Sequence, residues 1–265
     1  MLGRTRPQAI TQRYGIEVDE YMQGWEILEA IGRKRGFLMR GGEIDYNRSA
    51  VIVADEFRGG KLGRMMEWTA FEDQARTEGY TCICGIDEAG RGPLAGPVYA
   101  AAVVLRPGQV IEGVNDSKKL SEKKREALFD TICSQCAAYG IGSATEKEID
   151  EINILNATYL AMQRAVAALP VQPDCALVDG NRAPDLPLEV RTIIKGDAQS
   201  ASIAAASILA KVSRDRYMLQ MAEKYPQYAF EKHKGYGTKL HYERLEQYGI
   251  SPIHRLSFLK KWMNR

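Results

Sequence analysis

The chain has 265 residues, of which 45% are hydrophobic and 26% charged, and its formal net charge at pH 7 is +2. This composition predicts one good-sized domain with a small addition, and so weak a charge does not by itself indicate a nucleic-acid partner. No stretch approaches the roughly 18 to 20 uncharged apolar residues of a membrane span, and the N-terminus lacks a signal-peptide core, so we expect a soluble cytoplasmic protein with no membrane partner.

A small helical unit is predicted at the N-terminus, over residues 1–64. Apolar residues recur with helical spacing in residues 21–38 and again in residues 47–57. Between them Arg40-Gly41-Gly42 predicts a turn, and residues 58–64 read as a basic loop. A leading helix or linker is then expected over residues 65–80.

The stretch EAIGRKRGFLMRGGEIDYNRSAVIVADEFRGGKLGR in this unit resembles the C-terminal end of the bacterial ribosome-assembly GTPases that have a circularly permuted G domain. In those GTPases the C-terminal helical domain helps to bind ribosomal RNA, but the G domain is missing here. Ribosome binding through residues 1–64 is therefore a hypothesis, and three accounts stay open. The unit is a gene-fusion relic, a working auxiliary nucleic-acid module, or an upstream reading frame joined by an early start, for which Met65 and Met66 offer alternatives.

The larger domain is expected over residues 81–265, and its most informative feature is a strand that runs into adjacent acids. Residues 80–86 are almost wholly apolar, as in a buried strand, and Asp87 and Glu88 follow directly. Successive strand residues point to opposite faces, so the two carboxylates share a site only if the chain twists or a cation draws them together. The glycines of Gly90-Arg91-Gly92 permit that twist. The alternative is a solvated acidic turn followed by a hairpin loop.

Two further acids end apolar runs in the same way. Cys175 to Asp179 predicts a short buried strand closed by a carboxylate, and Val190 to Ile194 predicts another, followed by Asp197. Four carboxylates at one end of a sheet would repel one another without counter-ions. Oxygen-only ligands select Mg²⁺ or Mn²⁺, and two such ions about 3.5 to 4 Å apart clamp both oxygens of an in-line phosphoryl displacement. The pattern therefore predicts phosphodiester chemistry.

Basic residues gather at two places beyond these acids. A first cluster lies around the start of a predicted helix over residues 122–138, for which Ser121 is a good N-cap, and lysines near a helix start oppose the helix dipole. Its members are Lys118, Lys119, Lys123, Lys124 and Arg125. From residue 205 onward basic residues outnumber acidic ones, as a surface that tracks a nucleic-acid backbone would require. A solvated helix face explains some of these residues equally well. The second group follows a small-residue helix over residues 200–210 and comprises Lys211, Arg214 and Arg216, then Lys232, His233 and Lys234.

Six blocks of the chain resemble type 2 ribonuclease H, or ribonuclease HII, in the order of that family. They are GIDEAGRGPLAGPVYAAAVV, NDSKKLSEKKRE, LVDG, IIKGDAQSASIAAASILAKVSRDR, YPQYAFEKHKGYGTK and IHRLSF. The resemblance covers about residues 68–265 and implies an α/β, RNase H-like fold, with a mixed central sheet flanked by helices and a C-terminal helical extension. It also implies a monomer that hydrolyses the RNA strand of RNA/DNA hybrids. Such an enzyme also cuts duplex DNA on the 5′ side of a single embedded ribonucleotide, leaving a 3′-hydroxyl and a 5′-phosphate.

By the same resemblance the catalytic and metal-binding acids are Asp87, Glu88, Asp179 and Asp197, which hold two Mg²⁺ or Mn²⁺ ions. One ion activates water and the other stabilises the leaving 3′ oxygen. The resemblance assigns the reading of the 2′-hydroxyl to Gly90, Arg91 and Gly92, whose glycines let main chain approach a ligand closely. It places Tyr236 on the neighbouring sugar, a residue that would otherwise read as an ordinary loop aromatic. Lys118, Lys211 and Arg214 complete the expected substrate-binding set.

A competing class of function is a ribosome-associated RNA-binding protein led by the N-terminal unit. Zinc is not expected, because the five cysteines form only Cys82-x-Cys84 and Cys133-x-x-Cys136, and the chain has three histidines. We expect reduced, mostly buried thiols. A phosphate-binding G-x-x-x-x-G-K-[ST] loop is also missing.

Overall fold

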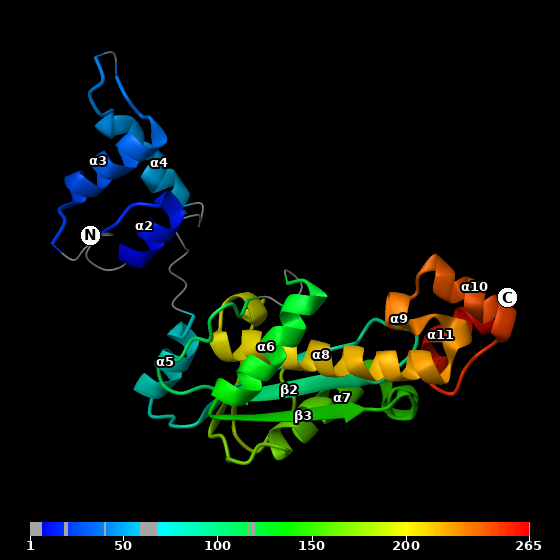
Figure 1. Ribbon diagram of the computed structural model, residues 1–265. Helices are drawn as coiled ribbons and strands as arrows, with labels where there is room; N and C mark the ends of the chain where they lie inside the picture. Colours follow the sequence, from blue (N-terminus) through cyan, green and yellow to red (C-terminus); the bar gives the residue numbers. More distant parts are fainter. Residues whose placement is uncertain are drawn as a thin grey trace. The chain divides into compact units, whose positions relative to one another are not determined.

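Figure 1 shows a computed structural model of the chain, which describes residues 7–18, 21–39, 41–58, 68–115, 117 and 120–264. The chain divides into two compact units, Met1–Met66 and Glu67–Arg265. Each unit buries apolar clusters of its own. Residues 59–64 of the predicted basic loop lie outside the described part of the chain.

The first unit is helical, with α2 over Pro7–Tyr14, α3 over Gly24–Arg35 and α4 over Tyr46–Arg58. The sequence pattern predicted α3 and α4 but not α2, whose eight residues are too few to show a clear period. Ile27 and Ile31 of α3 pack with residues of α2 in a small core.

The ends of α3 and the contact between α2 and α4 have local causes. Gln23 and Glu26 form a capping box, and Gly36 ends the helix in a left-handed conformation with φ 68°, so α3 is shorter than the predicted 21–38. Arg13 and Tyr14 both donate to the Glu56 carboxylate, at 2.6 and 2.8 Å. This carboxylate ties α2 to α4.

The second unit is built on a five-stranded mixed sheet in the order β3-β2-β1-β4-β5. Strands β1 (Ile83–Ala89), β2 (Val98–Val104) and β3 (Ala138–Ala144) are antiparallel neighbours, whereas β4 (Cys175–Asp179) and β5 (Glu189–Ile193) run parallel to β1. The mixed sheet predicted from the resemblance is confirmed.

Helices cover both faces of this sheet (Figure 1). Helix α7 (Glu146–Ala167) packs on one face in a core with Cys84 and Ile86, while α6 (Glu122–Gln135) and α8 (Ala201–Lys224) share a core with Ala89 on the other. Helix α5 (Ala70–Thr77) is the leading helix. A Cβ at Gly85 would overlap the main chain of α8, so this glycine lets the helix lie directly on β1.

A C-terminal helical extension follows α8, as expected. It contains the 3₁₀ turn Pro226–Tyr228, α9 (Phe230–His233), α10 (Lys239–Tyr248) and α11 (Leu256–Met263). Main-chain hydrogen bonds join it to the segment after β1: Leu94 N–H donates to Gly235 O at 2.8 Å, and Arg255 N–H donates to Leu94 O at 2.9 Å. The extension is thus attached next to the strand that carries the predicted acids.

Further predicted boundaries were wrong. Helix α6 ends at Gln135 and not at residue 138, because Ala138 already pairs with Val104 as the first residue of β3. Strand β1 continues to Ala89 and includes Asp87 and Glu88, because β2 pairs with it up to that point. Helix α8 continues to Lys224, so Lys211, Arg214 and Arg216 lie inside the helix and do not follow it. Both extensions depend on partners that are distant in sequence. The predicted N-cap Ser121 is confirmed, since its side chain accepts the Lys124 N–H.

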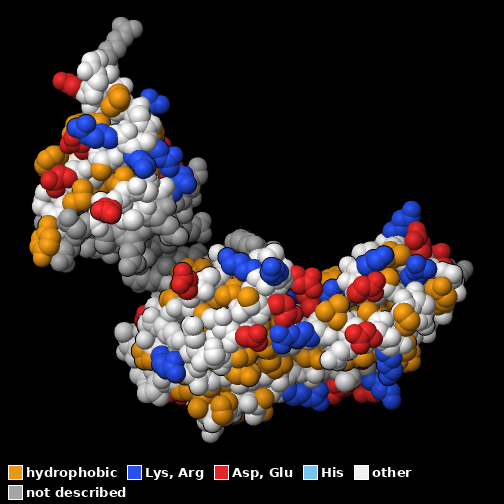
Figure 2. Space-filling model, viewed as in Figure 1, with side chains coloured by type: hydrophobic (Ala, Val, Ile, Leu, Met, Phe, Trp, Pro, Cys, Tyr) orange, Lys and Arg blue, Asp and Glu red, His pale blue; other side chains and the backbone are white. Residues whose placement is uncertain are grey.

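The surface of the second unit carries charges of both signs (Figure 2), and the cysteines form no disulfides. On the face shown in Figure 2, basic and acidic side chains of the second unit are intermixed. None of the described helices combines the length and the apolar character that a membrane span requires. All five cysteines are free, and Cys84, Cys136 and Cys175 are buried.

Candidate active site

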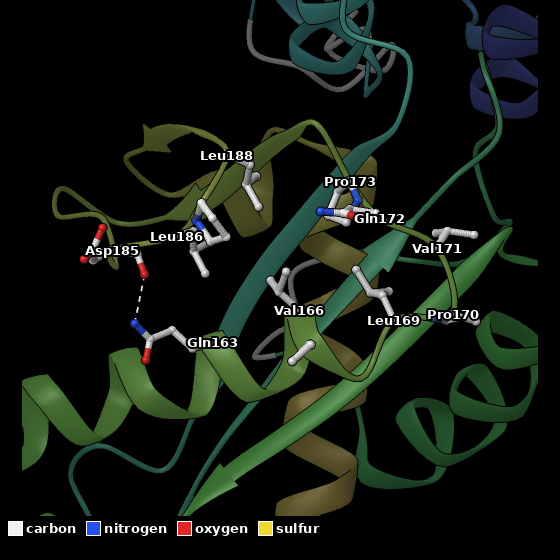
Figure 3. Close-up of a pocket in the computed structure, with 12 residues that line it drawn as sticks. Gln163, Val166, Leu169, Pro170, Val171, Gln172, Pro173, Asp185, Leu186 and Leu188 are labelled. Atoms are coloured by element: carbon white, nitrogen blue, oxygen red, sulfur yellow. Dashed lines mark hydrogen bonds between the residues drawn. The ribbon is translucent and has the colours of Figure 1, made fainter.

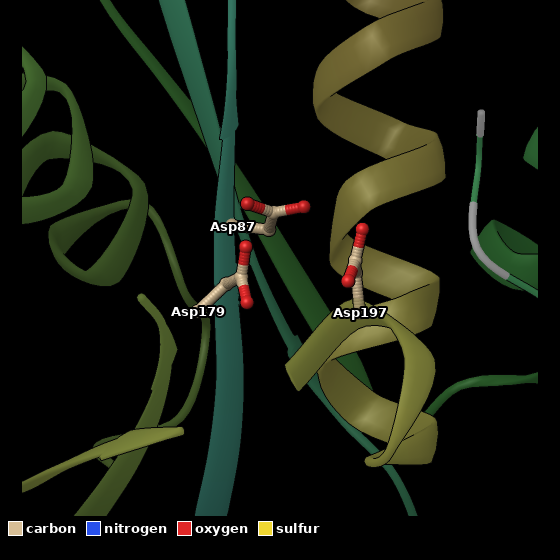
Figure 4. A group of neighbouring side chains, drawn as sticks. All are labelled: Asp87, Asp179 and Asp197. Atoms are coloured by element: carbon tan, nitrogen blue, oxygen red, sulfur yellow. The ribbon is translucent and has the colours of Figure 1, made fainter. Parts of the chain in front are cut away.

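Three aspartates converge at one end of the sheet (Figure 4). Asp87 comes from β1, Asp179 ends β4, and Asp197 lies in the 3₁₀ turn Gly196–Ala198 that precedes α8. Carboxylate oxygens of the three lie within 4.8 Å of one another. Since β1 and β4 are parallel, with Ile86 opposite Val178, the next residue of each strand brings Asp87 and Asp179 side by side.

Glu88 lies apart from this group, because adjacent strand residues face opposite sides of the sheet. Ile86 packs in the core with α7 and Ala89 in the core with α8, so Asp87 faces α8 and Glu88 faces α7. Glu88 still lines the same cleft, where its Oε1 lies 3.4 Å from Arg91 Nη1. The structure therefore groups three of the four predicted acids, and the fourth lines the same cleft from the α7 side of β1.

Burial and the charges of neighbouring carboxylates dominate the electrostatics of Asp87. Asp87 is only 5% exposed, and burial raises its pKa well above the usual range, with further contributions from the charges of Glu88 and Asp179. The Asp179 carboxylate accepts the Gly196 N–H at 2.6 Å, which fixes its orientation toward the turn that carries Asp197. Three converging carboxylates present oxygen donors alone, and this donor set fits Mg²⁺ or Mn²⁺.

A cleft of about 280 Å³ contains most of the predicted substrate-binding residues. Its walls are the acids, the loop after β1, and hydroxyl and basic side chains from the loop before α6, from α6 itself and from α8. Lys118 lies outside the described residues. The lining residues are Asp87, Glu88, Ala89, Gly90, Arg91, Gly92, Ser117, Arg125, Asp179, Ser207, Lys211 and Tyr236.

Four of these lining residues were not assigned a role from the sequence: Ala89, Ser117, Arg125 and Ser207. Arg125 was noticed only as part of a basic cluster, yet it donates to the carbonyls of Ser117 and Leu120 at 2.8 and 2.5 Å and so holds the loop before α6. Ser207 lies one helical turn before Lys211. A helical-face analysis of α8 starting from Lys211 would have found it.

Two buried arginines hold the loop of Gly90, Arg91 and Gly92 from beneath. Arg255 donates to the carbonyl oxygens of Gly90 at 2.6 Å and Arg91 at 3.0 Å. Gly90 has φ 99°, and a Cβ there would overlap the Arg214 side chain, so only glycine fits. Burial, with a smaller contribution from the charge of the nearby Arg214, lowers the pKa of Arg255 to about 9.

Arg214 lies below the cleft wall, because it is 1% exposed and donates to the carbonyls of Ala95 and Pro97, both at 3.1 Å. Burial lowers its pKa. Lys211 does line the cleft, and its ammonium contacts both carboxylate oxygens of Asp215 at 2.5 Å. Of these two basic residues of α8, only Lys211 reaches the space a substrate would occupy.

Tyr236 stands beside the glycine-arginine loop. Its ring lies 3.8 Å from the position of a Cβ at Gly92, and the guanidinium carbon of Arg214 lies 5.8 Å from the ring centroid. The side chain is 43% exposed. The loop and the tyrosine, 144 positions apart between Gly92 and Tyr236, are therefore adjacent parts of one surface.

A second hollow of about 560 Å³ lies at the C-terminal end of α7 (Figure 3). Its walls are largely apolar, with Val166, Leu169 and Leu186 among them, and Gln163 donates to the Asp185 carbonyl across it at 2.8 Å. None of the converging aspartates lines it. The chemistry therefore belongs to the smaller, acidic cleft.

The comparison with known proteins decides the family. A family model for ribonuclease HII matches residues 84–261. The chain belongs to the ribonuclease HII family. A ribonuclease HII of Caldicellulosiruptor bescii is 60% identical over 200 residues, which are 76% of this chain and 97% of that protein. The ribonuclease H2 structure from Pyrococcus horikoshii OT3 superposes with a TM-score of 0.57 at 31% identity, covering 67% of this chain and 93% of that one.

Membership of the family establishes the class of enzyme: a ribonuclease H, an endoribonuclease that acts on RNA/DNA hybrids and uses divalent metal ions. A ribonuclease HII of Clostridioides difficile is 50% identical over 245 residues, which are 92% of this chain and 93% of that protein. That match is longer than the whole second unit. It therefore extends into the first unit, part of which recurs in another ribonuclease HII.

Proposed function

We propose that this member of the ribonuclease HII family cuts duplex DNA on the 5′ side of a single embedded ribonucleotide as well as the RNA strand of hybrids. In both reactions it leaves a 3′-hydroxyl and a 5′-phosphate. One observation carries the proposal: Asp87 and Asp179, which converge with Asp197, line the same cleft as the loop of Gly90 to Gly92 and Tyr236. A phosphodiester at the aspartates then has its ribose within reach of the loop.

In this proposal Asp87, Asp179 and Asp197 hold two divalent ions, and Glu88 approaches them from the other face of β1. When bound, the ions activate a water molecule and neutralise charge on the leaving 3′ oxygen. The aspartates contribute a preformed set of oxygen ligands. Asp179 is oriented by the Gly196 N–H, and Asp197 is carried by the turn that supplies this group.

The main chain of Gly90 to Gly92 reads the ribose. The 2′-hydroxyl is the local difference between a ribonucleotide and a deoxyribonucleotide, and it both donates and accepts a hydrogen bond. Arg255 holds the Gly90 and Arg91 carbonyls at fixed positions, so the loop does not have to be ordered on binding. The exposed ring of Tyr236 stacks on the neighbouring sugar.

Contacts to the phosphate backbone come from basic and hydroxyl side chains of the cleft. Lys211 and Arg125 line the same cleft as the acids, and Ser117 and Ser207 add hydroxyl groups to its lining. Arg214 supports the loop and the tyrosine from below. Lys118, predicted from the same basic cluster as Arg125, is proposed to contact the backbone as well.

The test compares three proteins on a labelled DNA duplex with one ribonucleotide and on an RNA/DNA hybrid, with Mg²⁺, with Mn²⁺ or with EDTA. The three are the chain itself, Asp197→Asn and the control Asp185→Asn, which changes an exposed aspartate outside the cleft. We expect a metal-dependent nick 5′ of the ribonucleotide with the first and third proteins. With Asp197→Asn we expect cleavage to fall at least about a thousandfold, because a metal ligand is lost.

Cleavage of the hybrid without cleavage of the single-ribonucleotide duplex would show that the roles given to Gly90 to Gly92 and Tyr236 are wrong. Equal loss of activity in the Asp185→Asn control would show that the effect does not belong to the cleft.

For the first unit we propose an auxiliary module, separate from a catalytic domain that begins after a leading helix. The recurrence of part of this unit in the Clostridioides difficile relative supports a working role. A chain starting at Met66 should keep the kcat of the full chain and show a raised KM for nucleic acid. An unchanged KM would favour the early-start account or the fusion-relic account. Co-sedimentation with ribosomes of the full chain, but not of the truncated one, would favour the ribosomal hypothesis.

A further inference from the structure

The three histidines of the chain, His233, His241 and His254, are all buried in the C-terminal extension. None of them lines the cleft. Their hydrogen bonds nevertheless lead to the cleft, because the last acceptor in the series is the carbonyl of Tyr236.

The main chain determines which nitrogen of each ring carries a proton. Ser251 N–H donates to His254 Nδ1 at 2.9 Å, and a main-chain N–H can only donate, so the neutral His254 ring carries its proton on Nε2. Nε2 of His254 lies 2.9 Å from Nε2 of His241, and therefore His241 accepts there. The proton of His241 is then on Nδ1, which lies 2.9 Å from Tyr236 O and donates to it.

Tyr236 is held on both sides of its main chain. Its carbonyl accepts a second hydrogen bond from Thr238 N–H at 2.8 Å, and its own N–H donates to His233 O at 2.9 Å. The His233 ring stacks on the His241 ring, with centroids 4.3 Å apart and an angle of 18° between the planes. These contacts fix the backbone from which the exposed phenol ring projects.

We propose that His241, with its tautomer set by His254, is a positioning residue for Tyr236 and thereby for the preference of the enzyme for a single embedded ribonucleotide. The inference rests on the proposed role of Tyr236. Burial lowers the pKa of His241 and of His254 to about 4, so both rings are neutral at neutral pH, as this series of hydrogen bonds requires. A protonated His241 would direct an N–H at the N–H of His254.

Two substitutions of His241 separate the link to Tyr236 from simple core packing. In His241→Asn the amide nitrogen lies near the place of Nδ1, and the donor to Tyr236 O is kept. In His241→Gln the amide reaches the place of Nε2, so the contact with His254 is kept and the donor to Tyr236 O is lost. The readout is kcat/KM on the single-ribonucleotide duplex and on a hybrid with four ribonucleotides, with thermal unfolding measured alongside.

We expect His241→Gln to lower kcat/KM on the single-ribonucleotide duplex about tenfold, the usual effect of one lost hydrogen bond, with a smaller change on the hybrid. His241→Asn should stay within about twofold of the unchanged chain on both substrates. Equal losses in the two variants on both substrates would overturn the inference, because they would reflect packing alone.

A Tyr236→Ala background distinguishes failure of the inference from failure of the proposed function. If Tyr236→Ala does not change the preference between the two substrates, the proposed role of Tyr236 is wrong. Suppose that Tyr236→Ala does change the preference. If His241→Gln then lowers kcat/KM by the same factor in the Tyr236→Ala protein as in the unchanged chain, His241 does not act through Tyr236 and the inference is wrong. If His241→Gln causes no further loss of kcat/KM in the Tyr236→Ala protein, the inference is supported.

A measurement on the unchanged chain keeps the inference testable even if a variant does not fold. Nitrogen-15 NMR of the three imidazoles reports which ring nitrogen is protonated. We expect Nδ1–H for His241 and Nε2–H for His254 at neutral pH. The opposite tautomers, or a charged ring, would overturn the proposed series of hydrogen bonds.

Discussion

Replacing Asp87 with asparagine should stabilise the metal-free protein while it abolishes cleavage. Asp87 is 5% exposed and its carboxylate lies within 4.8 Å of those of Asp179 and Asp197. Burial and the neighbouring charges raise its pKa, so the folded state disfavours the ionised form. Asparagine has nearly the same shape without the charge. The substitution therefore removes a repulsion that the unfolded chain does not have.

The separation in the structure sets the size of this effect. Two unit charges 4.8 Å apart repel by about 3 kcal/mol at the effective dielectric constant of about 20 that suits protein sites. Partial protonation of the cluster relieves some of this, so we expect a gain of about 1 to 3 kcal/mol. For a unit of this size each kcal/mol raises Tm by about 2 to 4 °C.

The assay is thermal unfolding in EDTA and again with Mg²⁺, for the unchanged chain, Asp87→Asn and the exposed control Asp185→Asn. In EDTA only Asp87→Asn should gain stability. With Mg²⁺ the unchanged chain and the control should gain stability by mass action, whereas Asp87→Asn should gain much less. Monovalent salt at the same ionic strength separates binding from screening. A loss of stability in Asp87→Asn without metal, or equal Mg²⁺ effects in all three proteins, would refute the reasoning.

Three further outcomes are expected. Arg255→Met should destabilise the protein by about 3 to 5 kcal/mol in denaturant unfolding, because the carbonyls of Gly90 and Arg91 lose a buried donor. A loss below about 1 kcal/mol would mean that water replaces the guanidinium as the donor. Glu72→Ala should lower the free energy of unfolding by about 2 to 4 kcal/mol, because the buried carboxylate accepts three hydrogen bonds at the start of α8. Glu72→Gln should lower it less, and similar losses for the two variants would contradict this reasoning. The free energy of unfolding should fall as pH drops from about 6.5 through about 4, because the lowered pKa of His241 and of His254 means that the folded state binds protons at lower pH than the unfolded chain. Each ring accounts for about 3 kcal/mol of this loss. The same dependence of stability on pH in His241→Asn as in the unchanged chain would exclude a contribution from His241.

Local patterns in the sequence were enough to determine several features of this protein. The apolar run closed by Asp179 predicted β4, and Ser121 predicted the start of α6, because strand burial and helix capping depend on neighbouring residues. The motif after β1 also indicated a loop in which glycine permits close approach. The motifs carried the predicted acids and the family resemblance, and the resemblance in turn implied the fold class.

The tertiary structure alone decided how these parts meet. Pairing with β2 extended β1 through Asp87 and Glu88, and the resulting alternation turned Glu88 toward α7, away from the other three acids. Arginine is a residue type usually found at the surface, yet packing beneath Gly90 buries Arg214. The hydrogen bonds from His254 through His241 to Tyr236 have no local signal, because side-chain directions and ring tautomers are set by groups that only folding brings together. Periodicity and capping are short-range properties, whereas the shape of this cleft depends on contacts between segments that are far apart in the chain.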